Sequence, residues 1–268
     1  MTKADRLLIS YISMAPLALA FERTVEGMLY SVFDFQRPTL DLGCGEGLFS
    51  KLALELPIDT GIDPNARELR RAKQLGAYLE LVQCRGDAIP KPDGSYATVF
   101  SNSVLEHIED VDSVLKEVFR VLRPNGRFYF TVPCEKFDRY TVLNQLLTIL
   151  NLPEWGTRYR NFFNKFWQHY HYYPMVKWEE LARTHGFDVL KSHTYGPRSV
   201  CLLNDALVPF SIPAFLTKKL TNRWVLLPAL RRVYCYPLYL LFRDLLKGAD
   251  QGRDGGLVFI ALTKKGKA

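Results

Sequence analysis

Short apolar runs alternate with amphipathic stretches in the segment that starts near residue 38. The apolar runs predict strands at residues 39–42, 60–62, 81–84, 97–101 and 127–132. The stretches between them carry apolar residues at helical spacing and predict helices at 48–56, 66–75 and 111–122. Arg123-Pro124-Asn125-Gly126 is expected to end the last of these helices and to turn the chain into the next strand. Strands that alternate with helices indicate an α/β fold, with a parallel sheet covered on both faces.

The pattern changes on both sides of this alternating segment. An apolar stripe predicts helix over residues 5–34, whereas 134–174 is rich in aromatic residues and histidine and too irregular for one clean element. A helix at 176–184 and strands at 187–195 and 256–263 resume the alternation, with about sixty apolar, basic and proline-containing residues between the two strands. We therefore expect a helical cap (1–35), a core (36–133), an aromatic lid (134–175), a continuation of the core (176–199), a helical insertion (200–254), and a last strand with a basic tail (255–268).

Composition adds the distribution of charge and the state of the cysteines. Hydrophobic residues make up 48% of the 268 residues and charged residues 24%, as in a folded globular protein. Residues 1–134 carry 15 Lys and Arg against 18 Asp and Glu, and residues 135–268 carry 20 against 10, so an anionic partner is expected at the second half. The five cysteines lack metal or redox spacing, which predicts free thiols in a reducing compartment and a cytoplasmic location.

The first residues imitate a secretion signal. An uncharged run at 7–21 follows two basic residues and contains a cleavage-like Ala18-Leu19-Ala20. Asp5 in the basic region and Pro16 in the run argue against a signal, so we expect an apolar helix packed on the body. No other window approaches the roughly 20 apolar residues of a membrane span.

The segment from Thr39 to Gly47 combines a short buried strand, a glycine turn and the start of a helix. Glycine at alternate positions permits a sharp bend and a close approach of the backbone to a ligand. The N–H groups at the start of the helix are expected to favour an anionic ligand group. Leu48 stands where a dinucleotide-binding loop would have its third glycine, so the spacing predicts a nucleotide-like ligand but fits NAD poorly.

Three further motifs follow this loop in order. They are Gly61-Ile62-Asp63, Gly86-Asp87-Ala88-Ile89-Pro90 and Ser101-Asn102-Ser103-Val104-Leu105-Glu106-His107-Ile108. Together with the glycine loop and the run at 117–127, they resemble the class I S-adenosylmethionine (SAM)-dependent methyltransferases, closest to the type-11 small-molecule group, over about residues 36–133. The resemblance implies a Rossmann-like, seven-stranded, mostly parallel sheet with helices on both faces. It also implies helical lid insertions after strand five and between strands six and seven.

The resemblance implies SAM as cofactor and gives each motif a chemical role. Asp63 would accept hydrogen bonds from the ribose diol, Asp87 would accept from the adenine amine, and the Ala88 N–H would meet the adenine ring. Asp41 and loop carbonyls would meet the methionine ammonium group. The alternatives are a helix cap at Asp63, a solvated turn acid at Asp87 and a structural role for Asp41. The residues implied for SAM binding are Asp41, Gly43, Cys44, Gly45, Asp63, Pro64, Asp87, Ala88, Ser101 and Asn102.

Candidates for catalysis and for the lid are less defined. Methyl transfer from a sulfonium is an in-line displacement in which the protein mainly aligns the acceptor and excludes water, although an oxygen or carbon acceptor can also need a base. His107 is the candidate base, and a packed or capping residue is the alternative. The sequence has no evident cluster of acidic residues that would bind a metal ion, so no metal site is expected. The candidates for substrate contacts from the lid are Trp167, His169, His171 and Tyr172, with a surface or core position as the alternative for each of the two histidines.

The chain after strand four lacks the Asp/Asn-Pro-Pro-aromatic tetrad of enzymes that methylate planar amino nitrogens, which argues against DNA as acceptor. Residues 213–247 interleave apolar and aromatic residues with Lys and Arg. This composition suits an interfacial helix on an anionic membrane surface, a cap packed on the sheet, or a basic surface for a phosphorylated acceptor or RNA, although no RNA-binding module supports RNA.

We therefore expect a cytoplasmic methyltransferase, peripheral to the membrane if residues 213–247 bind one. It would methylate oxygen or carbon of a small acceptor that is apolar, lipid-linked or glycan-type. The alternatives are a non-catalytic SAM-binding interaction subunit, an RNA methyltransferase and an NAD-dependent oxidoreductase.

Overall fold

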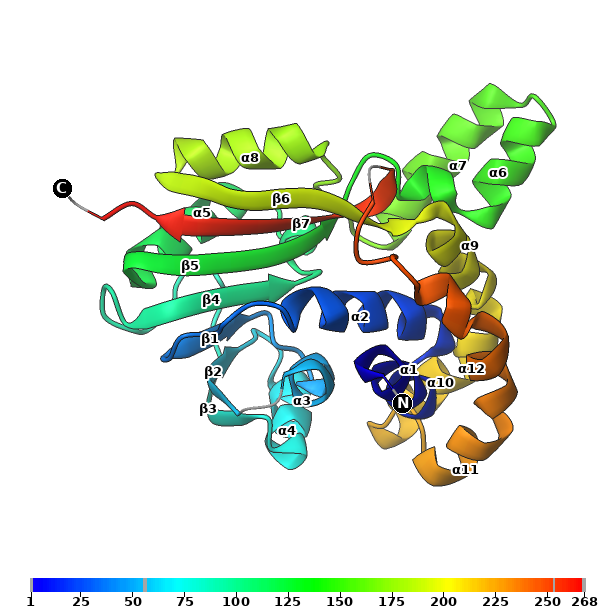
Figure 1. Cartoon of the computed structure of the whole chain (residues 1–268), viewed down its shortest axis with the longest axis horizontal. Helices are drawn as coiled ribbons and strands as arrows, with labels where there is room; N and C mark the ends of the chain where they lie inside the picture. Colours follow the sequence, from blue (N-terminus) through cyan, green and yellow to red (C-terminus); the bar gives the residue numbers. More distant parts are fainter. Residues whose placement is uncertain (1, 55–56, 253, 267–268) are drawn as a thin grey trace.

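The strands form one seven-stranded sheet in the order β3-β2-β1-β4-β5-β7-β6 (Figure 1). The computed structural model describes residues 2–54, 57–252 and 254–266. β1 to β5 pair in parallel, and β7 pairs antiparallel with both of its neighbours. The strands are β1 (Thr39–Leu42), β2 (Ile58–Ile62), β3 (Tyr78–Val82), β4 (Tyr96–Asn102), β5 (Leu122–Pro133), β6 (Phe187–Pro197) and β7 (Gly255–Lys264). The prediction of a mostly parallel, Rossmann-like sheet of seven strands is confirmed.

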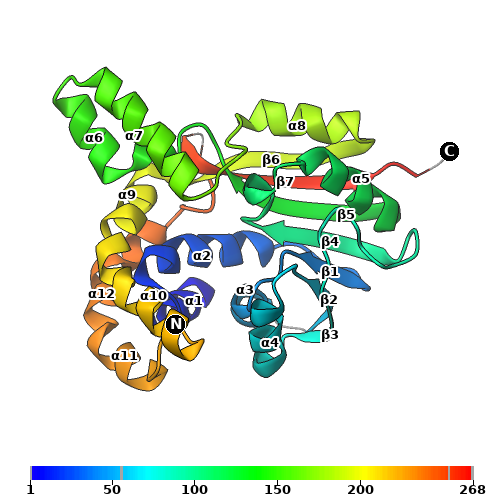
Figure 2. The same ribbon diagram turned by 180° about the vertical axis from the view of Figure 1, so that it is seen from behind.

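Helices pack on both faces of this sheet (Figures 1 and 2). One hydrophobic cluster joins α1, α2 and α3 to Phe100, Tyr129 and Phe259, and a second joins α5 and α8 to Val99 and Phe130. The helices are α1 (Lys3–Met14), α2 (Leu17–Tyr30), α3 (Leu48–Ala53), α4 (Ala66–Leu75), α5 (Val111–Val121), α6 (Val142–Ile149), α7 (Pro153–Phe166), α8 (Met175–Thr184), α9 (Arg198–Ala206), α10 (Val208–Thr221), α11 (Pro228–Tyr234) and α12 (Tyr236–Phe242), with 3-10 turns η1 (Leu105–His107), η2 (Asp138–Tyr140) and η3 (Arg243–Leu246).

The expected N-terminal helix is divided into two. α1 ends at Met14 and α2 starts after Pro16, because proline cannot donate the backbone hydrogen bond that a continuous helix would need there. Leu8 and Phe21 are buried in the first hydrophobic cluster, so the uncharged run at 7–21 packs on the body.

Three other boundaries differ from the sequence prediction. The third strand was expected at residues 81–84, but β3 begins at Tyr78 and ends at Val82. In this position it pairs with β2 along its whole length, from Ile58 with Tyr78 to Ile62 with Val82. The turn expected at 123–126 lies inside β5. It interrupts the regular pairing of β5 with β4, and Asn125 there has a φ of 63°. The helix expected at 48–56 ends at Ala53, and residues 55–56 lie outside the described part.

The two insertions are helical and lie at one end of the sheet (Figure 1). The segment after β5, whose aromatic residues concealed any regular pattern, forms η2 and the hairpin of α6 and α7. The segment between β6 and β7 forms α9 to α12 and η3. Among the described residues, no single helix is long and apolar enough to cross a membrane, although α9 and α10 together, bent by 56°, meet that criterion by length and composition.

Candidate active site

Three cavities adjoin at the carboxyl ends of the parallel strands. The loop cavity (about 270 Å³) borders the glycine loop at 43–47, and the strand-tip cavity (about 740 Å³) lies beyond the ends of β1 and β2. The lid cavity (about 230 Å³) lies between α2, α7 and α9. Gly43 lines the loop and strand-tip cavities, Arg23 lines the loop and lid cavities, and His107 lines the lid and strand-tip cavities. An extended ligand can therefore reach from the strand tips to the lid cavity, at the edge of the sheet where α/β proteins usually bind ligands.

The glycine loop has backbone conformations that favour glycine. Gly43, Gly45 and Gly47 have φ values of 77°, 51° and 78°. A Cβ atom on Gly43 would lie 2.5 Å from Val104 Cγ1, which is too close for any side chain. At Gly45 a Cβ atom would meet open space, so the backbone there borders the loop cavity directly.

The N–H groups of this loop at Gly43, Cys44 and Gly45 are used within the protein, and the anion site expected at the start of α3 stays a prediction. Gly43 and Cys44 both donate to the Ile62 carbonyl, and Gly45 donates to Asp63 Oδ2 at 3.0 Å. Three acidic side chains and the basic Arg23 and Lys218 line the loop cavity, so its charge favours a cationic ligand group. The acidic residues that line it are Asp41, Glu46 and Glu68.

Asp63 lies at the tip of β2 and holds the glycine loop. Its carboxylate accepts from the Asn65 N–H at 2.8 Å and from the Gly45 N–H at 3.0 Å, and burial raises its pKa above the usual range. The helix cap of α4 is Asn65, which accepts from the Arg67 N–H. Asp63 also lines the strand-tip cavity, so it can meet a ligand there while it positions the loop.

Asp41 is buried at the end of β1 and lines the loop cavity. Its Oδ2 atom accepts from the hydroxyl groups of Ser50, at 2.6 Å, and Tyr78, at 2.7 Å. Burial raises the pKa of Asp41 to about 6. These contacts support a structural role, and the position in the cavity is also compatible with a bound cation.

The remaining residues expected at the cofactor differ in position. Asp87 and Pro64 line the strand-tip cavity, where a hydrogen bond from Arg85 lowers the pKa of Asp87, and Asn102 lines the loop cavity. Ala88 and Ser101 line none of the three cavities, and their contacts with the cofactor stay predictions. The Ala88 N–H donates to the Arg85 carbonyl at 3.3 Å. The fully buried Ser101 hydroxyl donates to the Leu42 carbonyl at 3.0 Å, so it joins β4 to β1.

Two acidic side chains and a histidine among the residues that line the lid cavity have shifted pKa values. They are Glu22, Glu106 and His107. Burial raises the pKa of Glu106 to about 8, and its Oε2 atom is buried with no hydrogen-bond partner among the described residues. Burial, followed by the nearby Glu26 charge, raises the pKa of Glu22 to about 7. His107 Nε2 lies 3.7 Å from Glu106 Oε1, and burial lowers the pKa of His107. Glu106 therefore adjoins the candidate base His107 and has a pKa close to neutral pH.

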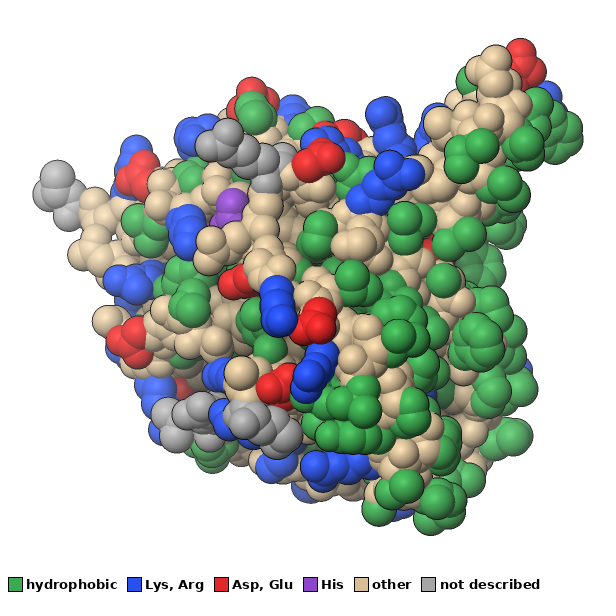
Figure 3. All heavy atoms as spheres, turned by 45° about the vertical axis from the view of Figure 1, so that its right-hand side comes forward, with side chains coloured by type: hydrophobic (Ala, Val, Ile, Leu, Met, Phe, Trp, Pro, Cys, Tyr) green, Lys and Arg blue, Asp and Glu red, His purple; other side chains and the backbone are tan. Residues whose placement is uncertain are grey.

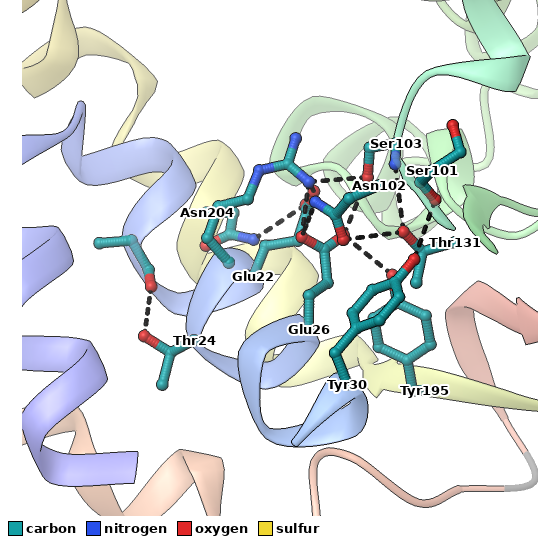
Figure 4. A network of polar contacts seen from close by, with 12 residues as sticks. Glu22, Thr24, Glu26, Tyr30, Ser101, Asn102, Ser103, Thr131, Tyr195 and Asn204 are labelled. Carbon is teal, nitrogen blue, oxygen red and sulfur yellow. Dashed lines mark hydrogen bonds and ion pairs between the residues drawn. The ribbon is translucent and has the colours of Figure 1, made fainter. Parts of the chain in front are cut away.

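A buried polar network anchors α2 across the strand ends (Figure 4). The fully buried Glu26 carboxylate accepts from Arg23, from Asn102 at 2.9 Å, from Ser103 at 2.8 Å and from Tyr195 at 3.0 Å. These donors come from α2, β4, the loop after β4, and β6, so one carboxylate joins four parts of the fold. The network fixes Arg23 at the boundary between the loop and lid cavities.

The expected lid residues divide into two pairs. Trp167 and His169 line the lid cavity, and the His169 ring lies 5.3 Å from the His107 ring. His171 instead forms a hydrogen bond between its Nδ1 and the Tyr173 hydroxyl and another between its Nε2 and the Ile108 carbonyl. His171 and Tyr172 line none of the three described cavities, and their contacts with a substrate stay a prediction.

The connection between α10 and α11 lies over the loop cavity. Trp224 donates its indole N–H to Glu46 of the glycine loop, and Arg71 of α4 pairs with the same carboxylate. Lys218 of α10 lies 3.9 Å from the centre of the Trp224 ring and pairs with Glu68 at 3.0 Å. The insertion between β6 and β7 therefore forms one wall of the cavity beside the glycine loop.

Sequence reasoning missed Glu22, Arg23, Asn204 and Trp224. Glu22 and Arg23 are the only charged residues between positions 7 and 25. Because buried charges need partners, two charges in an otherwise apolar helix could have indicated a buried site. Trp224 and Asn204 lie far from the motifs along the chain, and only the folded insertion brings them to the cavities.

A family model described as a methyltransferase domain (type 11) matches residues 40–130, which contain β1 to β4, most of β5, and the glycine loop. Residues 40–130 form a class I SAM-dependent methyltransferase domain. Outside it, the sequence relationship to curated proteins is partial. The chain is 31% identical over 153 residues to the sarcosine/dimethylglycine N-methyltransferase of Halorhodospira halochloris, covering 53% of this chain and 55% of that protein. It is 28% identical over 112 residues to the ubiquinone biosynthesis O-methyltransferase of Vibrio atlanticus, covering 40% of this chain and 47% of that protein.

The fold extends beyond the matched segment. A crystal structure of a SAM-dependent methyltransferase from Thermotoga maritima, described as a possible histamine N-methyltransferase, has a TM-score of 0.56 and 17% identity, with 93% of this chain and 92% of that one covered. The chain spans about half the length of the curated relatives it matches. The fold is therefore shared beyond residues 40–130, whereas the sequence match to these curated relatives covers part of the chain.

The residues present fit SAM. Gly45 presents backbone without a side chain beside the loop cavity, and Asp63 lines the strand-tip cavity. Acidic side chains outnumber basic ones around the loop cavity, where an ammonium and a sulfonium would be favoured. Asp63 would hold the ribose diol, and Asp41 would lie near the ammonium group.

Replacing Asp63 by Ala is expected to weaken SAM binding by about 1–3 kcal/mol, because the diol would lose its acceptor and the Gly45 N–H its partner. Isothermal titration calorimetry measures the change. Asp59→Ala is the control, since Asp59 pairs with Arg37 at the opposite end of β2. An affinity for SAM equal to that of the wild type in Asp63→Ala would exclude Asp63 from the site.

Proposed function

We propose that this protein transfers a methyl group from SAM to oxygen or carbon of a small acceptor bound in the lid cavity. The observation that carries the proposal is the junction of the lid cavity with the two cofactor-side cavities at Arg23 and His107. When bound, SAM supplies an electrophilic methyl carbon. An acceptor in the lid cavity lies on the other side of this junction, where in-line displacement can take place.

Glu106 is the base in this proposal, with His107 beside it. A carboxylate whose conjugate acid has a pKa near the working pH removes a proton from an acceptor hydroxyl or acidic carbon most effectively. The buried Oε2 atom of Glu106 has no hydrogen-bond partner among the described residues, so a proton on it would break no existing hydrogen bond. α2, α7 and α9 surround the cavity and limit access of water to the reacting atoms.

The acceptor is apolar, lipid-linked or glycan-type in this proposal. Aromatic and aliphatic side chains make up most of the walls of the lid cavity, which favours burial of an apolar group. Arg23 and His107 lie at the junction, with Glu106 beside His107, and these polar groups would hold an acceptor oxygen. The apolar wall residues are Leu19, Phe137, Phe163, Trp167, Val208, Phe215 and Leu257.

A labelled-SAM assay on fractionated cell extract tests the proposal. We expect the purified protein to transfer label to the lipid or polysaccharide fraction, and not to RNA or DNA. Label in RNA alone would overturn the acceptor class. Calorimetric binding of SAM with no transfer to any fraction would support a non-catalytic SAM-binding subunit, and binding of NAD in its place would support an oxidoreductase.

We further propose that the protein acts in the cytoplasm. Its five cysteines are free, and four of them are buried. Free thiols are usual where the surroundings are reducing.

A further inference from the structure

The large hydrophobic side chains that are exposed are concentrated in the two helical insertions. Among the described residues, nine lie between Val142 and Phe166 and thirteen between Phe210 and Leu241, against six elsewhere. Leu220 is 83% exposed, Ile149 78% and Leu241 69%. Clusters of this kind on a folded protein mark a contact surface.

These side chains gather on one end of the molecule. The hairpin of α6 and α7 and the helices α10 to α12 all lie at the end of the sheet that carries the lid cavity (Figure 1). The space-filling view shows hydrophobic side chains extending from the hairpin down over this side (Figure 3). We call this surface the insertion face; it comprises the exposed residues of 142–166 and 208–247.

Basic residues are interspersed on the insertion face. Residues 213–247 contain seven Lys and Arg and a single Asp. Lys219, Arg223 and Arg232 are exposed and have no ion-pair partner among the described residues. Apolar side chains with unpaired cations between them match the boundary between the headgroups and the acyl chains of an anionic bilayer.

We propose that the insertion face binds the surface of an anionic membrane, with α6–α7 and α10–α12 as two contact regions on either side of the lid cavity. This rests on the proposed function in one respect, since Phe163 of α7 and Phe215 of α10 line that cavity and a lipid-linked acceptor would enter between them. The long aliphatic stems of Lys and Arg lie along apolar surface while their charges reach the phosphates. The hydrophobic side chains insert without a membrane-spanning helix.

The charge of the face disfavours a second copy of the chain as its occupant. A twofold dimer brings the same patch of both copies together. Five exposed cationic residues and one Asp in residues 213–247 would then face the same residues of the second copy, and juxtaposed like charges oppose association. An anionic lipid surface supplies the opposite charge.

Vesicle flotation tests the proposal on the full chain. We expect it to float with vesicles of phosphatidylcholine and phosphatidylglycerol and to bind pure phosphatidylcholine at least tenfold more weakly. The variant Leu220→Glu/Leu241→Glu is expected to bind these mixed vesicles at least tenfold more weakly than the wild type. Lys219→Glu/Arg232→Glu is expected to weaken vesicle binding about fivefold for each reversed charge. Ile149→Glu, on the hairpin, is expected to weaken binding as well.

Matched controls separate membrane contact from folding and from catalysis. Leu79→Glu changes an equally apolar side chain, 64% exposed, on β3, and Lys73→Glu reverses an exposed charge on α4; both should float like the wild type. SAM affinity, measured by calorimetry, should be unchanged in every variant. A wild type that does not float, or a concentration-dependent dimer abolished by Leu220→Glu/Leu241→Glu, would overturn the membrane proposal and leave the proposed methyl transfer standing.

Discussion

Glu106→Gln is expected to lower kcat for methyl transfer by about 10²–10⁴-fold, the usual contribution of a positioned base. The amide has nearly the same shape as the carboxyl group but cannot accept the acceptor's proton. The measurement is the rate of label transfer to the fraction that the wild type methylates. SAM affinity should be retained, because Glu106 lines the lid cavity and not the cavity of the glycine loop.

The pH dependence separates Glu106 from a residue that only shapes the cavity. A base works in its ionised form, and the pKa of Glu106 is about 8. The kcat of the wild type should therefore rise as the pH increases toward 8 and level off above it, and Glu106→Gln should lose this rise. Glu22 is another carboxyl group of the cavity and serves as the control, so Glu22→Gln should keep the rise of kcat with pH. A pH profile lost in Glu22→Gln and kept in Glu106→Gln would assign the base to Glu22.

Arg23→Met should lower the free energy of unfolding by about 3–5 kcal/mol, the cost of removing one partner from a buried ion pair. Arg23 pairs with the fully buried Glu26, lies 3.9 Å from Glu22 and donates to the Ser103 hydroxyl at 2.7 Å. Methionine has a similar length but leaves the Glu26 charge without its cation. Urea denaturation followed by circular dichroism measures the loss.

An exposed ion pair is the matched control for Arg23. Arg37 pairs with Asp59 and its side chain is 51% exposed, so Arg37→Met should cost less than about 1 kcal/mol. Equal losses in the two variants would show that the Arg23 network does not hold α2 on the sheet.

The sheet and the glycine loop could be predicted because local pattern and backbone geometry determine them. β1 has the predicted bounds, 39–42, since a short apolar run between proline and glycine leaves little freedom. Asp63 was found for the same reason, as the acid that ends the second strand. The details at Ala88 and Ser101 were not predictable, because they depend on which hydrogen bonds the folded loops make with Arg85 and Leu42.

The lid cavity could not be predicted, because its walls come from segments without a regular pattern. α6 and α7 leave large apolar residues such as Ile149 and Phe162 exposed, so the contrast between an apolar and a polar side that identifies a helix is weak there. The role of α2 was hidden for another reason. Glu22, Arg23 and Glu26 have the composition of a solvated helix surface, and only the donors from β4 and β6 make their burial favourable.

The position of the lid cavity determines how relatives of this protein should be compared. Of the residues that line it, only Ser103, Glu106 and His107 lie within the matched segment at 40–130. Two enzymes can therefore agree along the whole cofactor domain and still accept chemically unrelated substrates. Orthologues with the same acceptor should be recognised by agreement in α2, α7, α9 and α10, and a chimera that exchanges these helices should exchange substrate preference while SAM affinity stays constant.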